Sequence, residues 1–177
     1  MSTWFVFLRA INIGARRFPM AELRAVLAEA GYGGVETHIQ TGNVRLTASH
    51  RSRTRLEAAL EELLEKDRGF PVATIALTPR ELTQVAADAT AIVEAGPAAY
   101  GQYVSLLKAT PSAADVERVE ALSREGERIL VRGRAVHFCY DVPYHAAKVS
   151  NAAIEKILGP ATNRNVTVIT ALAEKWC

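Results

Sequence analysis

Apolar and polar positions in the first half of the chain predict a β-α-β-β-α-β unit followed by a helix. Apolar residues run almost without interruption from Trp4 to Ile13, which is typical of a buried strand. From Met20 to Gly31 they recur at helical spacing, so a strand, a loop and an amphipathic helix begin the chain. The rest of this half is expected to form strands at 35–40, 44–47 and 72–77 and helices around 56–64 and 79–89.

The second half repeats much of this order. A strand from Tyr103 to Ala109 precedes a helix, two strands joined by an Arg-Gly-Arg turn, and a helix that Gly159 and Pro160 end. Residues Val166 to Trp176 favour a closing helix because of their alanine, leucine, glutamate and lysine content. The expected ranges are 128–131 and 135–142 for the two strands, and 112–122, 150–158 and 166–176 for the helices.

The recurring order predicts an α+β protein built from two ferredoxin-like β-α-β-β-α subdomains that arose by duplication. We expect the N-terminal subdomain over residues 1–93 and the C-terminal subdomain over 102–177. Between them, Gly96, Pro97 and Gly101 interrupt both periodicities, so the boundary is expected at 94–101.

Composition and charge narrow the classes of function. With 177 residues, of which 49% are hydrophobic, the chain can build a real core. Its 21 basic and 19 acidic residues leave a net charge of +2, so any attraction for phosphate must be local. The apolar run at the N-terminus is too short for a signal or a membrane span, and Cys139 and Cys177 form no disulfide framework. We expect a soluble cytoplasmic protein with reduced thiols and no membrane contact.

The first polar cluster follows the first strand. Arg9 and Asn12 lie at its end, and Gly14 lets the backbone turn before the helix near Pro19. A strand end, a glycine loop and a helix N-terminus together favour an anion, because unpaired N–H groups and the helix dipole point the same way. Alternatively, Arg9 pairs with a buried carboxylate or with carbonyl groups. Arg16 and Arg17 lie in the same loop. They either add positive charge to the site or are ordinary solvated residues.

The second cluster is Gln40-Thr41-Gly42-Asn43, between two short strands. A turn that needs positive backbone angles explains Gly42 and Asn43 without any ligand. Gln40 is not required by a turn, so its side chain is a candidate to bind an amide, base or sugar, or to fasten the loop.

A third polar set lies in the second half. Lys148 precedes one helix start, and Arg164 with Asn165 precedes the last helix. Basic residues at helix starts oppose the helix dipole, and such a local conflict is typical of a binding site. The alternative is that Arg164 clamps a carboxylate of the other subdomain.

The sequence gives little support to catalysis or metal binding. His145, near Tyr140, Asp141 and Tyr144, is the histidine in a cluster suited to proton transfer. No histidine pair has metal-site spacing, and the chain lacks the Walker A and dinucleotide-binding patterns, so we expect no metal and no cofactor. Cys139 fits a small buried residue better than a nucleophile. Nucleic acid has weak support, because no aromatic-rich strand of the RNA-binding kind is present.

Three segments resemble a known family. They are Leu-Arg-Ala-Ile-Asn-Ile-Gly at 8–14, Pro-Met-x-x-Leu-Arg at 19–24 and Ile-Gln-Thr-Gly-Asn-Val at 39–44. Together they are similar to the bacterial family called domain of unknown function 1697, and the resemblance spans almost the full length. It implies two packed ferredoxin-like subdomains and no particular activity.

The chain departs from the family pattern at four positions. Ala10 stands where glycine is usual, and Thr41 where serine is usual. Val166 and Thr167 replace a tryptophan and an asparagine, which removes a stacking face and a donor near the tail. A tail site shared by the family would therefore be altered in this chain.

Three hypotheses follow. The first is a small binding protein that holds a phosphorylated metabolite or a nucleic-acid backbone between its subdomains, through Arg9, Asn12, Lys148 and Arg164. The second is an enzyme that uses Tyr140, Asp141 or His145. The third is a structural interaction module, favoured if the polar groups prove to be paired internally.

Overall fold

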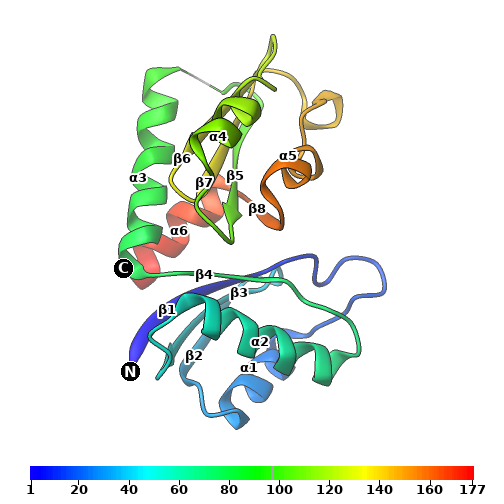
Figure 1. The fold of residues 1–177 in the computed structure, drawn as a ribbon, viewed down its shortest axis with the longest axis vertical. Helices are drawn as coiled ribbons and strands as arrows, with labels where there is room; N and C mark the ends of the chain where they lie inside the picture. Colours follow the sequence, from blue (N-terminus) through cyan, green and yellow to red (C-terminus); the bar gives the residue numbers. More distant parts are fainter. Residues whose placement is uncertain (97) are drawn as a thin grey trace. The chain divides into compact units, whose positions relative to one another are not determined.

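Eight strands form two four-stranded antiparallel sheets in the part of the chain that the computed structural model describes, residues 1–96 and 98–177 (Figure 1). Residues Met1–Glu81 and Trp176 make up unit 1, and residues Leu82–Lys175 and Cys177 make up unit 2. The α+β class predicted from the sequence is confirmed. The two units divide between Glu81 and Leu82, inside a helix that ends at Ala95. This division lies before residues 94–101, where the sequence predicts the boundary. Pro97, in that predicted segment, lies outside the described residues.

Unit 1 contains a sheet of strand order β2-β3-β1-β4. One face of this sheet packs against two helices through a core that includes Val6, Leu23, Leu46 and Leu60. The elements, in chain order, are β1 (Ser2–Leu8), α1 (Met20–Glu29), β2 (Gly33–His38), β3 (Asn43–Ala48), α2 (Arg53–Arg68) and β4 (Thr74–Leu77). The predicted first strand was wrong beyond Leu8, because the chain turns there and Ala10 has a left-handed φ of 53°.

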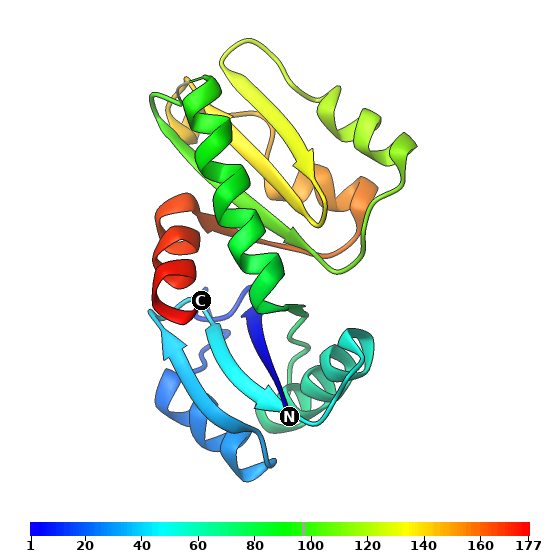
Figure 2. The ribbon, with the colours of Figure 1, turned by 90° about the vertical axis from the view of Figure 1, so that its left-hand side faces the viewer.

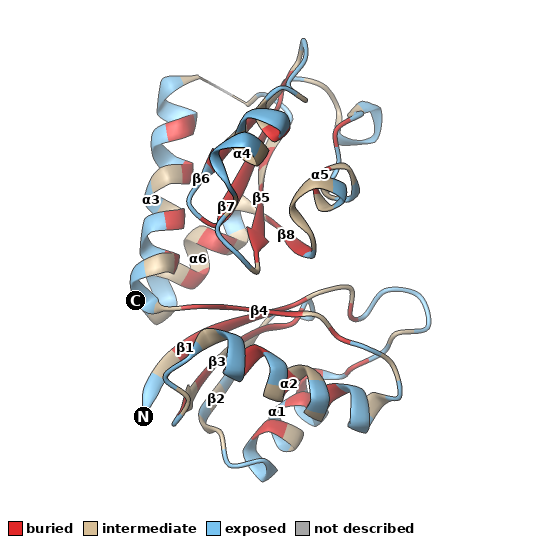
Figure 3. Ribbon diagram, viewed as in Figure 1, coloured by how far each residue is buried: buried red, intermediate tan, exposed pale blue. Residues whose placement is uncertain are grey.

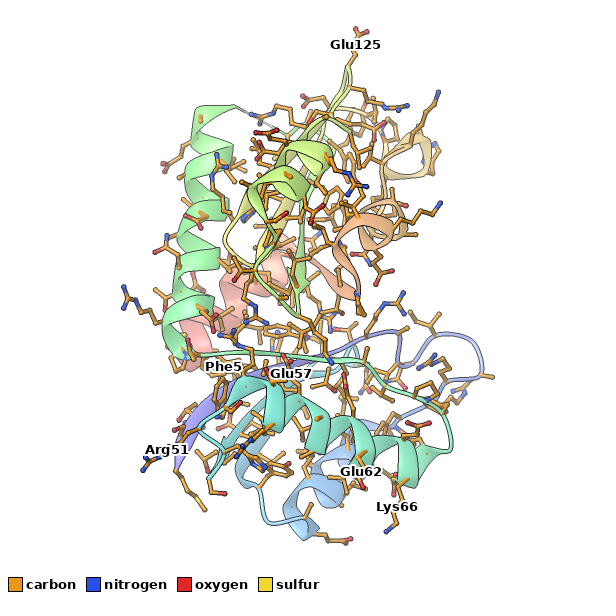
Figure 4. The ribbon with its side chains drawn as sticks, viewed as in Figure 1. Phe5, Arg51, Glu57, Glu62, Lys66 and Glu125 are labelled. Carbon is orange, nitrogen blue, oxygen red and sulfur yellow. The ribbon has the colours of Figure 1, made fainter. Side chains whose placement is uncertain are left out.

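The exposed edge of β4 is covered by carboxylates from α2. Glu57, which is 4% exposed, accepts the Ala76 N–H at 2.8 Å. One turn later, Glu61 accepts the Thr74 N–H at 2.8 Å. Glu57 is labelled on α2 in Figure 4, where it lies next to β4. These bonds satisfy backbone donors that would otherwise offer β4 as an edge for another strand.

Helix α2, which follows β3, and the helix that follows β4 begin with side-chain caps. Ser52 accepts the Arg55 N–H at the start of α2, and Gly69, with φ 75°, ends it. Helix α3 (Pro79–Ala95) opens with a capping box in which Thr78 and Glu81 each accept the other's N–H. The helix predicted to end at Ala89 therefore continues for about six more residues, because nothing in 90–95 breaks it.

Unit 2 contains a sheet of order β6-β7-β5-β8 with helices on both faces. Helices α4 and α5 cover one face through a core around Val119, Phe138 and Ile154. On the opposite face lies α3, drawn in green in Figure 2, whose Ala89 carbonyl accepts the Gln102 side-chain amide. The elements are β5 (Gly101–Leu107), α4 (Ala113–Glu120), β6 (Glu127–Arg132), β7 (Ala135–Tyr140), η1 (Tyr144–Ala146), α5 (Asn151–Leu158), β8 (Ala161–Asn165) and α6 (Val166–Trp176).

Strand β8 was not predicted from the sequence. Its residues, Ala-Thr-Asn-Arg-Asn, show no apolar alternation, yet they pair with β5 from Tyr103↔Asn165 to Leu107↔Ala161. The strands of both sheets are largely buried, whereas the outer sides of the helices are exposed (Figure 3). Among the described residues, no helix combines the length and the apolar character that crossing a membrane requires.

Candidate functional site

The two N-terminal motifs meet in unit 1 through the Asn12 side chain. Its Nδ2 donates to the Gln40 carbonyl oxygen at 2.7 Å and to the Phe18 carbonyl oxygen at 3.0 Å. Its Oδ1 accepts the Phe18 N–H at 2.8 Å. One amide therefore ties the loop 9–19 to the loop 39–42. We call these two segments the tied loops, and in them Asn12 is a structural clamp.

The backbone of the tied loops is strained. Ala10, Asn12 and Ile39 have φ values of 53°, 55° and 50°, the left-handed region that non-glycine residues rarely occupy. Each such residue costs on the order of 1 kcal/mol, and a β-branched residue such as Ile39 costs most. The neighbouring backbone holds them in place, because Leu8 and Arg9 donate N–H bonds to the carbonyls of Gly42 and Ala73. Strain of this kind is concentrated at functional sites in proteins.

Gly42 and Asn43 are accounted for by the turn itself. A Cβ at Gly42 would lie 2.7 Å from Cδ1 of Ile11, and its φ is 75°. The buried Asn43 amide donates to the His38 carbonyl oxygen and to Thr41 Oγ1, both at 3.0 Å. These contacts favour the turn explanation for this tripeptide.

The arginines of the tied loops differ in their surroundings. Arg9 is half-buried. Arg16 donates to the Pro71 carbonyl oxygen and its guanidinium lies 4.8 Å from the centre of the Phe70 ring, so it fastens the loop to its neighbour. Arg17 and Gln40 are exposed. The surface also includes two exposed isoleucines, Ile13 at 65% and Ile39 at 47%.

Lys148 and Arg164, predicted to share a site, lie on opposite faces of the sheet in unit 2. The Lys148 backbone N–H donates to the Glu127 carboxylate on the face that carries α4 and α5. Arg164 is paired with Val104, whose other cross-strand partner is His137, so its side chain lies on the face that α3 covers. The structure therefore does not bring these two basic groups together.

Arg164 is held inside β8. It is 7% exposed, and burial lowers the pKa of its guanidinium to about 10, so it stays charged at neutral pH. Its Nη1 donates to Thr162 Oγ1 and to the Asn163 carbonyl oxygen, both at 2.8 Å. Asn165 instead caps α6 by accepting the Thr167 N–H. The Arg164 guanidinium thus bonds to two residues of its own strand.

Glu127 is a buried carboxylate that was not predicted from the sequence. Glu127, which is 3% exposed, accepts the backbone N–H groups of Lys148 at 3.0 Å and Val149 at 2.8 Å. It pins the loop before α5 to β6. The one sequence signal is its position, two residues before the inward-facing Ile129 of the same strand.

The cluster of Tyr140, Asp141 and His145 does not form a catalytic arrangement. Tyr140 is 2% exposed, donates its hydroxyl to the Val149 carbonyl oxygen at 2.8 Å, and has its pKa raised by burial well above the ordinary value. Asp141 accepts the Ala99 N–H, and His145 is exposed in η1. Within the described residues, no hydrogen bond joins these three side chains.

The fold defines an α+β protein with two antiparallel sheets of the same strand order. Residues 1–137 match the family model described as "Protein of unknown function (DUF1697)", so the chain belongs to this family, as its N-terminal motifs predicted. The matched range contains the tied loops and ends before Lys148, Arg164 and Asn165.

The solved structure of conserved bacterial protein SP0830 from Streptococcus pneumoniae is similar, with a TM-score of 0.69 and 20% sequence identity. The alignment covers 99% of this chain and 98% of that one. At this identity the similarity concerns the fold alone. No curated protein matches the sequence.

Proposed function

We propose that the chain is a small binding protein whose binding surface is the pair of tied loops in unit 1. One observation carries the proposal: the Asn12 side chain fixes both loops while three non-glycine residues are kept in a left-handed conformation. A loop with no binding role could adopt a relaxed backbone, so the retained strain favours a preformed surface.

The chemistry of the surface favours an anion, either a phosphorylated metabolite or a nucleic-acid backbone. Arg9 and Arg17 supply positive charge, and Gln40 adds an exposed amide. The first N–H groups of α1 have no side-chain cap, because Pro19 stands at the N-cap position. Such N–H groups suit phosphate oxygens. In this proposal Asn12 positions the loops, and Lys148, Arg164 and Asn165 are no longer members of the site.

A double variant and a matched control variant test the proposal. We expect the purified full-length protein to retain or bind pyrophosphate, or a short single-stranded oligonucleotide, in native mass spectrometry. Replacing both Arg17→Gln and Gln40→Ala should weaken that binding by about tenfold, since a bond to a charged group contributes about 1.5–3 kcal/mol. Arg55→Gln, at an exposed position on α2, is the matched control. Absence of any bound anion, or an equal loss in the control, would exclude this function.

We also propose that the two sheets are a duplicated ferredoxin-like unit. Equivalent backbone bonds support it: Leu8 N–H donates to Gly42 in unit 1, as Leu107 N–H donates to Arg134 in unit 2. In both sheets a glutamate of the helix that precedes the last strand accepts the first N–H of that strand. These pairs are Glu61 with Thr74 and Glu155 with Ala161. Neither Cys139 nor Cys177 is in a disulfide, which supports the proposal of a cytoplasmic location.

A further inference from the structure

A groove of about 350 Å³ lies between α3 and the edge strand β6 of unit 2, a volume that suits a small molecule. Arg128 and Arg132 line it from the same face of β6, about 13 Å apart along the strand. Leu130 lies between them, and the small side chains of Ala91 and Ala95 form the wall on α3. The groove is thus apolar in the middle and basic toward both ends of the β6 segment.

Polar atoms with unmet hydrogen bonds lie beside the floor of this groove. Leu130 pairs directly with His137 across the sheet, so their side chains share a face and lie about 5 Å apart at Cβ. His137 is fully buried, and neither ring nitrogen has a hydrogen-bond partner among the described residues. The same holds for Oε1 of the buried Gln102, whose Nε2 donates to the Ala89 carbonyl oxygen at 3.1 Å. Such orphaned buried atoms are rare in proteins.

We propose that this groove binds a small organic anion with an apolar body. A guanidinium of Arg128 or Arg132 pairs with its carboxylate or phosphate group, since this planar donor suits either oxyanion. The apolar body lies over Leu130, Ala91 and Ala95. Burial lowers the pKa of His137 to about 4, so at neutral pH this ring behind Leu130 is uncharged and the positive charge of the groove comes from its two arginines.

Other groups at the groove restrict the ligand. Asp88 lines it from α3 and accepts the Gln84 side-chain amide at 2.9 Å. Its carboxylate disfavours a second negative charge nearby. Arg128 also donates to the Gly96 carbonyl oxygen, and Arg132 lies 3.6 Å from Glu120. Each guanidinium has five donors, so these contacts leave donors for a ligand.

Solution NMR of the full-length protein, labelled with ¹⁵N, tests the proposal with three probes: phenyl phosphate, benzoate and inorganic phosphate. We expect saturable shifts of the Arg128 and Arg132 side-chain N–H signals with the first or second probe. Tighter binding of phenyl phosphate identifies the anionic group of the ligand as a phosphate, and tighter binding of benzoate identifies it as a carboxylate. Inorganic phosphate should bind more weakly than phenyl phosphate, because it lacks the apolar body.

Two variants decide the outcome. Arg132→Gln should weaken binding of the better probe by about tenfold. Arg118→Gln removes an exposed arginine that pairs with Asp115 on α4, and it should change nothing. Since Arg132 is exposed, we expect its replacement to leave the fold intact. Absence of saturable shifts, equal weakening in both variants, or equal binding of inorganic and phenyl phosphate would overturn the proposal. The residues of the tied loops are untouched, so these outcomes are independent of the function proposed above.

Discussion

Ala10 adopts a backbone conformation that glycine would occupy without strain. Its φ of 53° gives a physical reason for the glycine that is usual at this position in the family pattern. We expect Ala10→Gly to raise the free energy of unfolding by about 0.5–1 kcal/mol, after the greater flexibility of glycine in the unfolded chain is subtracted. Ala15→Gly, in the same loop but without a positive φ, should be neutral or destabilising. Urea denaturation of both variants provides the measurement, and equal effects would show that strain at Ala10 is not the cause.

His137 makes stability depend on pH. Burial lowers the pKa of its ring to about 4 in the folded state, against about 6.5 in the unfolded chain. Between these values the unfolded chain binds a proton that the folded protein does not, so stability falls as pH falls from about 6.5 to about 4. The full loss is roughly 3 kcal/mol, and it is absent above pH 6.5.

The measurement is urea denaturation of the wild type and of His137→Leu at several pH values from 4 to 7.5. The variant should lose less stability over this range than the wild type, because it has no ring to protonate. If both proteins show the same slope, His137 is not the titrating group.

At the scale of elements, carboxylates that cap strand edges are expected to stabilise unit 1. Glu57→Ala removes the acceptor of the Ala76 N–H and should lower the free energy of unfolding by about 1–3 kcal/mol, whereas Glu57→Gln keeps an acceptor oxygen and should lower it less. Glu62 lies on the exposed side of the same helix, so Glu62→Ala should fall within about 0.5 kcal/mol of the wild type (Figure 4). Thermal unfolding followed by circular dichroism compares the three. A loss in Glu62→Ala equal to that in Glu57→Ala would point to helix propensity instead of edge capping.

Elements with a strong local signal were predictable, and those formed by distant pairing were not. Helix α2 follows from its leucines at helical spacing and from Gly69, which ends it in the left-handed conformation. Strand β8 has no such signal, because its polar residues are ordered by pairing with β5. The same distinction holds at the tied loops: both polar clusters were visible in the sequence, but the bond that joins Asn12 to Gln40 spans 28 positions. Local periodicity carries no information about such a contact.

At the scale of the whole molecule, residues near the two ends of the chain meet within unit 1. Phe5, on β1, stacks on Trp176, at the end of α6, with ring centres 5.5 Å apart and an angle of 18° between the rings. We expect Trp176→Ala to lower the free energy of unfolding by about 2 kcal/mol, because it removes both buried apolar area and the ring contact. Trp176→Phe retains a ring and should lose less than half as much.

Hydrogen exchange at β1, combined with urea denaturation, measures the effect where the contact lies. In Trp176→Ala the amides of β1 should exchange faster, since opening of this strand becomes less costly when Phe5 loses its stacking partner. In Trp176→Phe they should stay close to wild type. If exchange at β1 is unchanged in both variants, the C-terminal residues do not stabilise the first strand, and unit 1 derives its stability from residues 1–81 alone.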